Sequence, residues 1–115
     1  MAYTHGKNYI HRDIKPENIL IQKNEFEGKV VEVAKLSDFG ISKRADELPL
    51  TDYVGTRWYR APELLIKMKN YSKNVDVFSL GCIMAEFYNL EILFNGKNSN
   101  DQLVLMMKKL GTPTK

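Results

Sequence analysis

The chain has 115 residues, 43% hydrophobic and 27% charged, which is an ordinary composition for one globular unit. Its net charge of +3, with both signs interspersed, is too mild to indicate a nucleic-acid surface. No apolar stretch is long enough to predict a membrane span, and no signal-peptide core follows the first residue. The single cysteine permits no internal disulfide, which is compatible with a reducing, intracellular compartment.

A helix end, a hairpin and a long loop are predicted in the first half of the chain. Residues 1–9 look like the end of a helix and a turn, with Gly6 as the C-cap. Two β-branched runs, 19–22 and 30–36, flank a polar, Gly-containing stretch and predict a β-hairpin. Residues 41–60 show little periodicity and predict a long loop, which within a compact domain is usually functional.

Three helices are predicted in the second half. Pro62 suits the first position of a short helix at 63–68, because its missing N–H would have no partner there. Residues 75–88 are apolar on almost every face, which predicts a helix buried all round. Residues 99–102 (Ser-Asn-Asp-Gln) have the form of a capping box, and the helix that they begin is expected to end at Gly111.

Three short motifs carry the chemistry. Residues 11–18 read His-Arg-Asp-Ile-Lys-Pro-Glu-Asn, residues 38–40 read Asp-Phe-Gly, and residues 61–63 read Ala-Pro-Glu. An Asp, a Lys and an Asn on one short loop, with a second Asp nearby, suit phosphoryl transfer from a metal–nucleotide complex. A lone Asp-x-Lys would more often be a solvated polar loop, but the complete string outweighs that alternative. The three motifs in this order resemble the signature of eukaryotic protein kinase domains.

The resemblance implies a fold and its limits. Residues 1–115 are expected to be part of a kinase catalytic domain: an α+β, mainly α-helical C-terminal lobe with a β-hairpin after the catalytic loop. None of the seven glycines forms Gly-x-Gly-x-x-Gly, so the N-terminal lobe with its phosphate-covering loop is expected to be missing, as is the C-terminal end of the domain. An insertion near residues 25–29 is expected to lengthen the hairpin.

The resemblance also implies the roles of the motif residues, with ATP and Mg²⁺ as cofactors. Asp13 would orient the substrate hydroxyl and accept its proton, and Lys15 would neutralise charge on the transferred phosphoryl group. Asn18 and Asp38 would hold Mg²⁺. Lys15, Asn18 and Asp38 would thereby contact the bound nucleotide, and Leu20 would form part of the floor beneath it.

Other motif residues are expected to act structurally. The ring of His11 would pack under Phe39, and Gly40 would give the backbone freedom beside the metal-binding Asp. Asp76 is the lone charge early in the apolar helix, where the family position accepts hydrogen bonds from the catalytic-loop backbone. Glu63 would pair with an Arg that lies outside these residues, so it is expected to be unpaired here.

Three further side chains are expected to be ordinary. His5 belongs to no motif and is expected at the surface or at a helix end. Lys35 follows Val-Ala, as in the strand that grips the nucleotide in kinases, but it comes after the catalytic loop and is therefore expected to face solvent. Cys82 is expected to be a small core residue rather than a nucleophile.

The segment before Ala-Pro-Glu is the most diagnostic for a subfamily. Thr51-Asp52-Tyr53, followed by Val-Gly-Thr-Arg-Trp-Tyr-Arg at 54–60, resembles the branch that holds MAP kinases and cyclin-dependent kinases. The Asp of the triplet is similar to the male-germ-cell-associated and cyclin-dependent-kinase-like kinases. The resemblance implies that Thr51 and Tyr53 are phosphorylated, although two exposed loop residues remain the alternative interpretation.

Arginines are the natural partners of such phosphates. Arg12 would pair with phosphorylated Thr51, while Arg57 and Arg60 would pair with phosphorylated Tyr53. One departure from relatives is a Lys, residue 43, where an Arg is common. Because Lys lacks the bidentate fork, ordering by phosphate is expected to be weaker.

Two functions are compatible with this pattern. The first is a Ser/Thr protein kinase, proline-directed, of which these residues alone would be inactive. The second is a non-enzymatic truncated lobe that acts as a regulatory binding module. The first implies protein substrates with Ser/Thr-Pro sites, an upstream activating kinase and an intracellular location in cytoplasm or nucleus; it implies no nucleic-acid or membrane partner. The sequence leaves open whether a cyclin-like partner exists.

Overall fold

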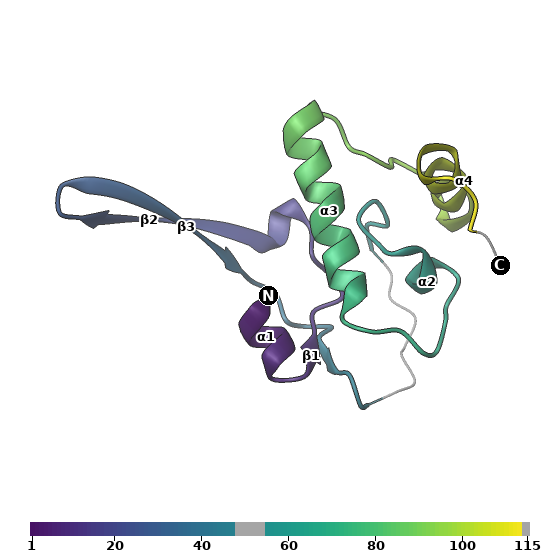
Figure 1. The fold of residues 1–115 in the computed structure, drawn as a ribbon, viewed down its shortest axis with the longest axis horizontal. Helices are drawn as coiled ribbons and strands as arrows, with labels where there is room; N and C mark the ends of the chain where they lie inside the picture. Colours follow the sequence, from purple (N-terminus) through teal and green to yellow (C-terminus); the bar gives the residue numbers. More distant parts are fainter. Residues whose placement is uncertain (48–54, 114–115) are drawn as a thin grey trace.

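Short helices surround one long central helix, and a hairpin projects from this helical body (Figure 1). The structure, a computed structural model, describes residues 1–47 and 55–113. Its elements in chain order are α1 (Ala2–Gly6), β1 (Tyr9–Ile10), the 3₁₀ helix η1 (Pro16–Asn18), β2 (Ile19–Phe26), β3 (Lys29–Leu36), β4 (Lys43–Arg44), α2 (Pro62–Leu65), α3 (Asn74–Asn89) and α4 (Ser99–Leu110). No helix within the described ranges is long and apolar enough to cross a membrane.

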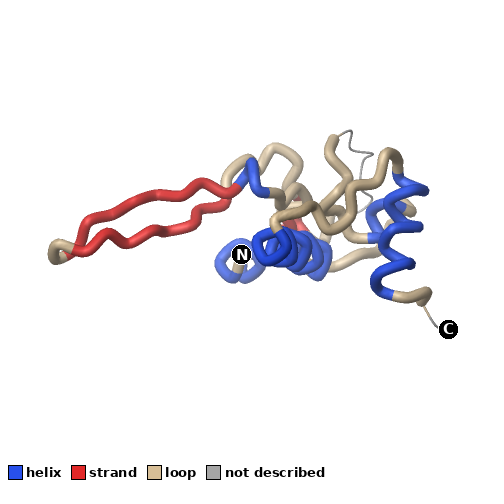
Figure 2. The backbone as a smooth tube through the Cα atoms, turned by 90° about the horizontal axis from the view of Figure 1, so that it is seen from above, coloured by secondary structure: helices blue, strands red, loops and turns tan. Residues whose placement is uncertain are grey.

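The predicted hairpin is confirmed and is longer than the β-branched runs suggested. Strands β2 and β3 pair antiparallel from Ile19 opposite Leu36 out to Phe26 opposite Lys29. The two loop residues between them, Glu27 and Gly28, both have positive φ (51° and 74°), as the turns that match strand twist require. Figure 2 shows the hairpin extending away from the helices. The sequence pattern underestimated the length of β2, because its polar residues have low strand propensity and cross-strand pairing outweighs that propensity in the fold.

Two local expectations about the first half are wrong. Strand β4 lies inside the predicted long loop and pairs antiparallel with β1, through Tyr9–Arg44 and Ile10–Lys43, to form a second sheet. Two-residue strands are too short to leave a periodic pattern in the sequence. Gly6 is not the C-cap of α1; the C-cap is residue 7, and Asn8 takes the left-handed conformation with φ 63°.

Helix α3 is the centre of the core, but it is not buried all round. Its buried residues are Val75, Asp76, Ser79, Cys82 and Ile83. On its other face Phe87 and Tyr88 are 73% and 88% exposed within the described chain. Buried side chains from several segments pack together around it: Ile14, Tyr59, Leu65, Cys82, Ile83, Phe94 and Met106. The core therefore lies between the segment at 11–18, α3 and α4.

The helix ends in the second half differ slightly from prediction. Helix α2 ends at Leu65, before Met68, because Lys67 is left-handed with φ 57°. Helix α4 has the expected length, but its cap lies one residue earlier than predicted. Asn98 accepts from the Asp101 N–H at 2.9 Å, and the Asp101 carboxylate accepts from the Lys97 N–H at 2.9 Å. The first bond satisfies an N–H group of the first turn, which has no partner within the helix, and the second ties the residue before the N-cap to that turn.

Candidate active site

Asp13, Lys15 and Asn18 lie together on the loop between β1 and β2. The Asn18 side-chain amide donates to the Asp13 carbonyl at 2.8 Å and to the Asp13 carboxylate at 3.1 Å. The Lys15 ammonium lies 3.2 Å from the same carboxylate oxygen. Asp13 is 7% exposed and Asn18 is 6% exposed. The turn of η1, which starts at Pro16, brings the amide back over the carboxylate, so the buried carboxylate contacts both the Lys15 ammonium and an amide donor.

The His11 ring joins this loop to the Asp-Phe-Gly segment. Its Nε2 donates to the Ser37 carbonyl at 3.0 Å, and its Nδ1 accepts from the Asp13 N–H at 3.3 Å. A carbonyl can only accept and an N–H can only donate, which together define the neutral Nε2–H tautomer. The ring also meets Phe39 edge-on, with centroids 4.8 Å apart. His11 therefore has every polar ring atom occupied and acts as a structural connector.

Asp76 anchors the predicted catalytic loop, at 11–18, to α3. Its carboxylate accepts from the His11 N–H at 2.9 Å and the Arg12 N–H at 2.8 Å, and it is 1% exposed. A third donor was missed by sequence reasoning: His5 Nε2 lies 2.7 Å from the same carboxylate. His5 lies in the last turn of α1, as expected for a helix end, but the expectation that it is an ordinary residue is wrong, because it contacts a buried carboxylate. Only the fold brings residues 71 positions apart into contact, although a lone buried acid in α3 signals that donors must exist.

Arg12 ties three segments together. Its backbone is left-handed, with φ 70°, and its guanidinium donates to the Ile41 carbonyl through both Nε, at 2.7 Å, and a terminal nitrogen. The other terminal nitrogen donates to the Tyr71 hydroxyl at 3.3 Å. Burial raises the pKa of Tyr71, so this hydroxyl stays protonated at neutral pH. The residue next to Asp13 thus contacts both the stretch after Asp-Phe-Gly and the loop before α3.

Asp38 and Asn18 flank the base of the hairpin. Both the Ser37 N–H, at 2.9 Å, and its hydroxyl, at 3.1 Å, donate to the Asn18 carbonyl, which holds the two segments side by side. Asp38 is left-handed with φ 57°, is exposed, and accepts from the Gly40 N–H at 3.2 Å. A Cβ on Gly40 would lie 3.1 Å from that carboxylate, so Gly suits the position.

The donor set at this base fits a hard cation. Mg²⁺ prefers oxygen ligands and takes one or two carboxylates together with substrate phosphates. Asn18 uses its amide nitrogen on Asp13, and no described residue donates to its amide oxygen. Asp38 supplies an exposed carboxylate. No group of three or more His, Cys, Asp or Glu side chains suited to a metal exists in the described residues.

The segment before Ala-Pro-Glu is held by polar contacts that sequence reasoning missed. Ser79 donates to the Tyr59 carbonyl at 2.7 Å, and the Tyr59 hydroxyl donates to Glu86 at 2.7 Å, which joins the segment to α3. Gln102 of α4, fully buried, donates to the Trp58 carbonyl at 3.1 Å and accepts from the Gly96 N–H at 2.8 Å. The sequence signal for these contacts was a polar residue, Gln102, on the buried side of α4, because a buried amide needs hydrogen-bond partners.

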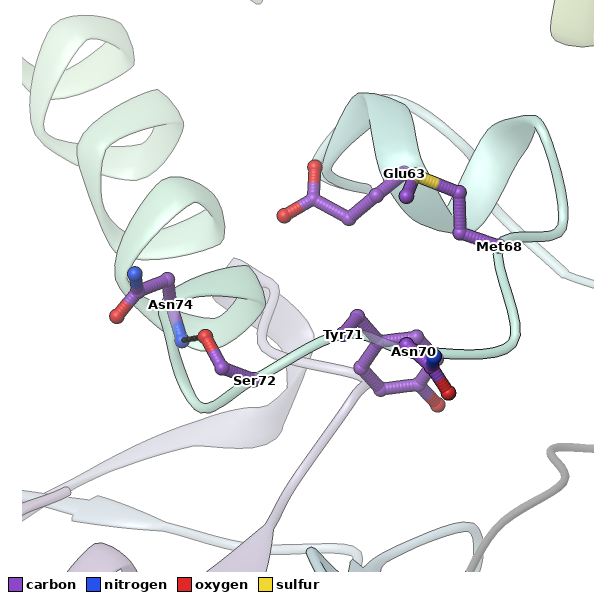
Figure 3. A pocket seen from close by; sticks show the side chains of 6 residues that line it. All are labelled: Glu63, Met68, Asn70, Tyr71, Ser72 and Asn74. Atoms are coloured by element: carbon purple, nitrogen blue, oxygen red, sulfur yellow. Dashed lines mark hydrogen bonds between the residues drawn. The ribbon is translucent and has the colours of Figure 1, made fainter.

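The remaining predicted residues lie apart from the catalytic loop or outside the described ranges. Leu20 in β2 is 57% exposed, and Arg57 and Arg60 are half-buried near the start of α2. Thr51 and Tyr53 lie outside the described residues. A pocket of about 590 Å³ separates α2 from the start of α3 (Figure 3). Its lining residues are Glu63, Met68, Asn70, Tyr71, Ser72 and Asn74. No described residue pairs with the Glu63 carboxylate.

Comparison with known proteins identifies the family. The family model described as "Protein kinase domain" matches residues 1–114. The chain belongs to the protein kinase domain family. Relatives include "Serine/threonine-protein kinase ICK" of Rattus norvegicus, with 44% identity over 100% of this chain, and "Cyclin-dependent kinase F-4" of Oryza sativa subsp. japonica, with 41% identity over 98%. "Mitogen-activated protein kinase mpkB" of Aspergillus fumigatus is 43% identical over 96% of the chain.

The similarity to these relatives supports a branch of the kinase family rather than a particular substrate. The chain spans 17%, 23% and 31% of the lengths of these three proteins, so it corresponds to a minor part of each. The homologues are Ser/Thr kinases from the branch of cyclin-dependent and MAP kinases, which supports the predicted branch for this kinase domain. The family in general uses ATP and Mg²⁺ and acts on protein substrates.

Proposed function

We propose that these residues form the C-terminal-lobe part of a Ser/Thr protein kinase that transfers the γ-phosphoryl group of ATP to Ser or Thr followed by Pro. Asp13 orients the acceptor hydroxyl and takes its proton, while Lys15 offsets charge on the phosphoryl group. Asn18 and Asp38 hold Mg²⁺, which when bound neutralises charge on the nucleotide phosphates. The Val-Gly and Arg that follow Tyr53 resemble the segment that favours Pro after the acceptor.

One observation carries the proposal: the Asp13 carboxylate is buried within hydrogen-bond reach of both Lys15 and Asn18. Fixed partners keep the carboxylate in one orientation, and positioning supplies most of the catalysis in phosphoryl transfer. The Asp76 carboxylate helps to fix the position of Asp13, because it accepts hydrogen bonds from the backbone N–H groups of the two residues before it. A solvated polar loop would not need such an anchor.

The test is peptide phosphorylation by a kinase domain reconstructed around these residues. We expect a peptide with Ser-Pro to be phosphorylated faster than the same peptide with Ser-Ala. Asp13→Asn should abolish turnover with the far-UV circular dichroism unchanged. Lys35→Gln, on the exposed part of β3, is the matched control and should keep full turnover. Equal rates on both peptides would refute the Pro preference, and full activity of Asp13→Asn would refute the catalytic assignment.

Phosphorylation of Thr51 and Tyr53 is the proposed switch of this activity. Arg12, which is half-buried and reaches the segment after Asp-Phe-Gly, is positioned to gain an anionic partner there. In the reconstructed domain, Thr51→Ala together with Tyr53→Phe should lower turnover by about tenfold or more. Turnover equal to that of the unmodified sequence would contradict the switch.

The 115 residues by themselves are proposed to be inactive, and a regulatory binding module is the second candidate. The sequence holds no Gly-x-Gly-x-x-Gly and no strand Lys with its Glu partner upstream of the catalytic loop, so ATP would be poorly aligned. The exposed apolar face of α3, at Met84, Phe87 and Tyr88, favours binding of another protein surface. Peptide turnover by the purified 115-residue chain, lost in Asp13→Asn, would contradict both statements.

A further inference from the structure

The outer edge of β3 carries a regular pattern that the kinase chemistry does not use. Opposite residues of an antiparallel pair share a face, and side chains alternate between faces along a strand. One face of β3 therefore presents Lys29, Val31, Val33 and Lys35 at every second position. All four are exposed, and Val31 and Val33 are 48% and 37% exposed. The pattern is two adjacent apolar side chains with a cation at each end.

The backbone edge beside this row is unoccupied by any strand of the described chain. The sheet has two strands in the order β2–β3, so the outer N–H and C=O groups of β3 face away from the hairpin. The hairpin itself projects from the helical body (Figures 1 and 2). An eight-residue strand with a free edge is a template for adding another strand.

The charges on this face indicate which kind of strand could pair with β3. The face holds Lys29 and Lys35 from β3, and from β2 it holds Leu20, Gln22, Asn24 and Phe26, so it has two cations and no anion. The ion pair of the hairpin, Lys23 with Glu32 at 3.1 Å, lies on the opposite face. Opposite charges directly across a strand pair stabilise it, and like charges destabilise it. A complementary strand therefore has an acid at each end and apolar side chains at the two central positions.

A second copy of this chain does not fit that requirement. In antiparallel self-pairing, the register that sets Val31 against Val33 sets Lys29 against Lys35. Parallel in-register self-pairing sets each lysine against its own copy. Both arrangements oppose like charges at the two ends of the pairing.

We propose that β3 is a docking edge for an extended segment of another protein with the pattern acidic-x-apolar-x-apolar-x-acidic, which adds as a third strand. Main-chain hydrogen bonds supply the affinity, while the lysines and valines supply the selection. The row runs along the outer side of the hairpin, from Lys29 at the turn to Lys35 near the base, and neither lysine belongs to the loop at 11–18. The docking edge is argued from β3 and its charges, so it does not rest on the proposed kinase activity. The competing explanation is that the lysines only guard the edge against aggregation.

The test uses two fluorescein-labelled peptides and the 115-residue chain. The acidic probe is Glu-Thr-Val-Thr-Val-Thr-Glu, and its charge mirror has Lys at both ends. Fluorescence anisotropy should show saturable binding of the acidic probe and binding of the mirror at least about tenfold weaker. Lys29→Glu with Lys35→Glu should invert this preference. Lys69→Glu with Lys108→Glu, which changes the net charge equally at exposed positions elsewhere, should preserve it.

Two further measurements locate the site. Val31→Thr with Val33→Thr keeps strand propensity and should weaken the acidic probe by several-fold. Hydrogen exchange should slow in β3 and not in β2 when the probe is added. Absence of saturable binding up to about 1 mM probe would overturn the proposal and leave the lysines as guards. Equal affinity for both probes, or concentration-dependent dimers that protect β3, would also overturn it.

Discussion

Replacement of Asp76 by Ala should destabilise the chain more than replacement of any exposed acid. The carboxylate is fully buried and accepts three hydrogen bonds, two of them from the backbone N–H groups of His11 and Arg12. A buried N–H left without an acceptor costs about 1–3 kcal/mol. The His11 N–H is buried in this way, whereas Arg12 is half-buried and can recruit water. With the small cavity added, the free energy of unfolding should fall by about 3–5 kcal/mol, which is typical when one partner of a buried charged network is removed.

Urea unfolding followed by tryptophan fluorescence measures this loss. Trp58 is the single tryptophan, and its indole N–H donates to the Gly96 carbonyl at 3.3 Å, so its emission reports on packing between the helices. The matched control is Asp46→Ala. Asp46 is exposed and contacts Arg44 at the surface, and its removal should leave the unfolding curve unchanged. A loss for Asp76→Ala as small as that for Asp46→Ala would refute the claim that this carboxylate anchors the loop.

Two further predictions concern packing and the thiol. Gly96→Ala should lower the free energy of unfolding by about 1–3 kcal/mol, because its Cβ would lie 2.5 Å from the backbone nitrogen and side-chain oxygen of Gln102. Gly81→Ala, in an open position on α3, should instead raise the free energy of unfolding by about 0.5–1 kcal/mol. Equal effects of the two substitutions would contradict the predicted clash at residue 96. Burial raises the pKa of Cys82 from 9.0 to about 12, so native protein should resist iodoacetamide near neutral pH and react once urea unfolds it. Since the raised pKa favours the neutral thiol, the contribution of Cys82 to stability is complete below pH 9.0 and is lost as pH rises toward about 12. Rapid alkylation of the native protein would contradict the burial of this thiol.

Local sequence pattern determined the elements whose cause is local. The hairpin followed from two β-branched runs, α3 followed from a long, almost wholly apolar stretch, and α4 followed from a capping-box signal and from Gly111 as a stop. The motif at 11–18 predicted a protein kinase domain, which the family model confirms, because its residue types must lie close together on one loop. These features depend on neighbours within a few residues, which a sequence displays directly.

The tertiary structure decided which distant groups meet. No local pattern could pair His5 with Asp76, join β1 to β4, or place Gln102 between Trp58 and Gly96, because these contacts cross up to 71 positions. It also decided that α3 keeps one apolar face exposed among the described residues. An apolar composition states what a helix can bury, but only the arrangement of its neighbours sets how much of its surface they cover. The free outer edge of β3 is also a result of the tertiary structure, since a free strand edge can be recognised only when the pairing of the strands is known.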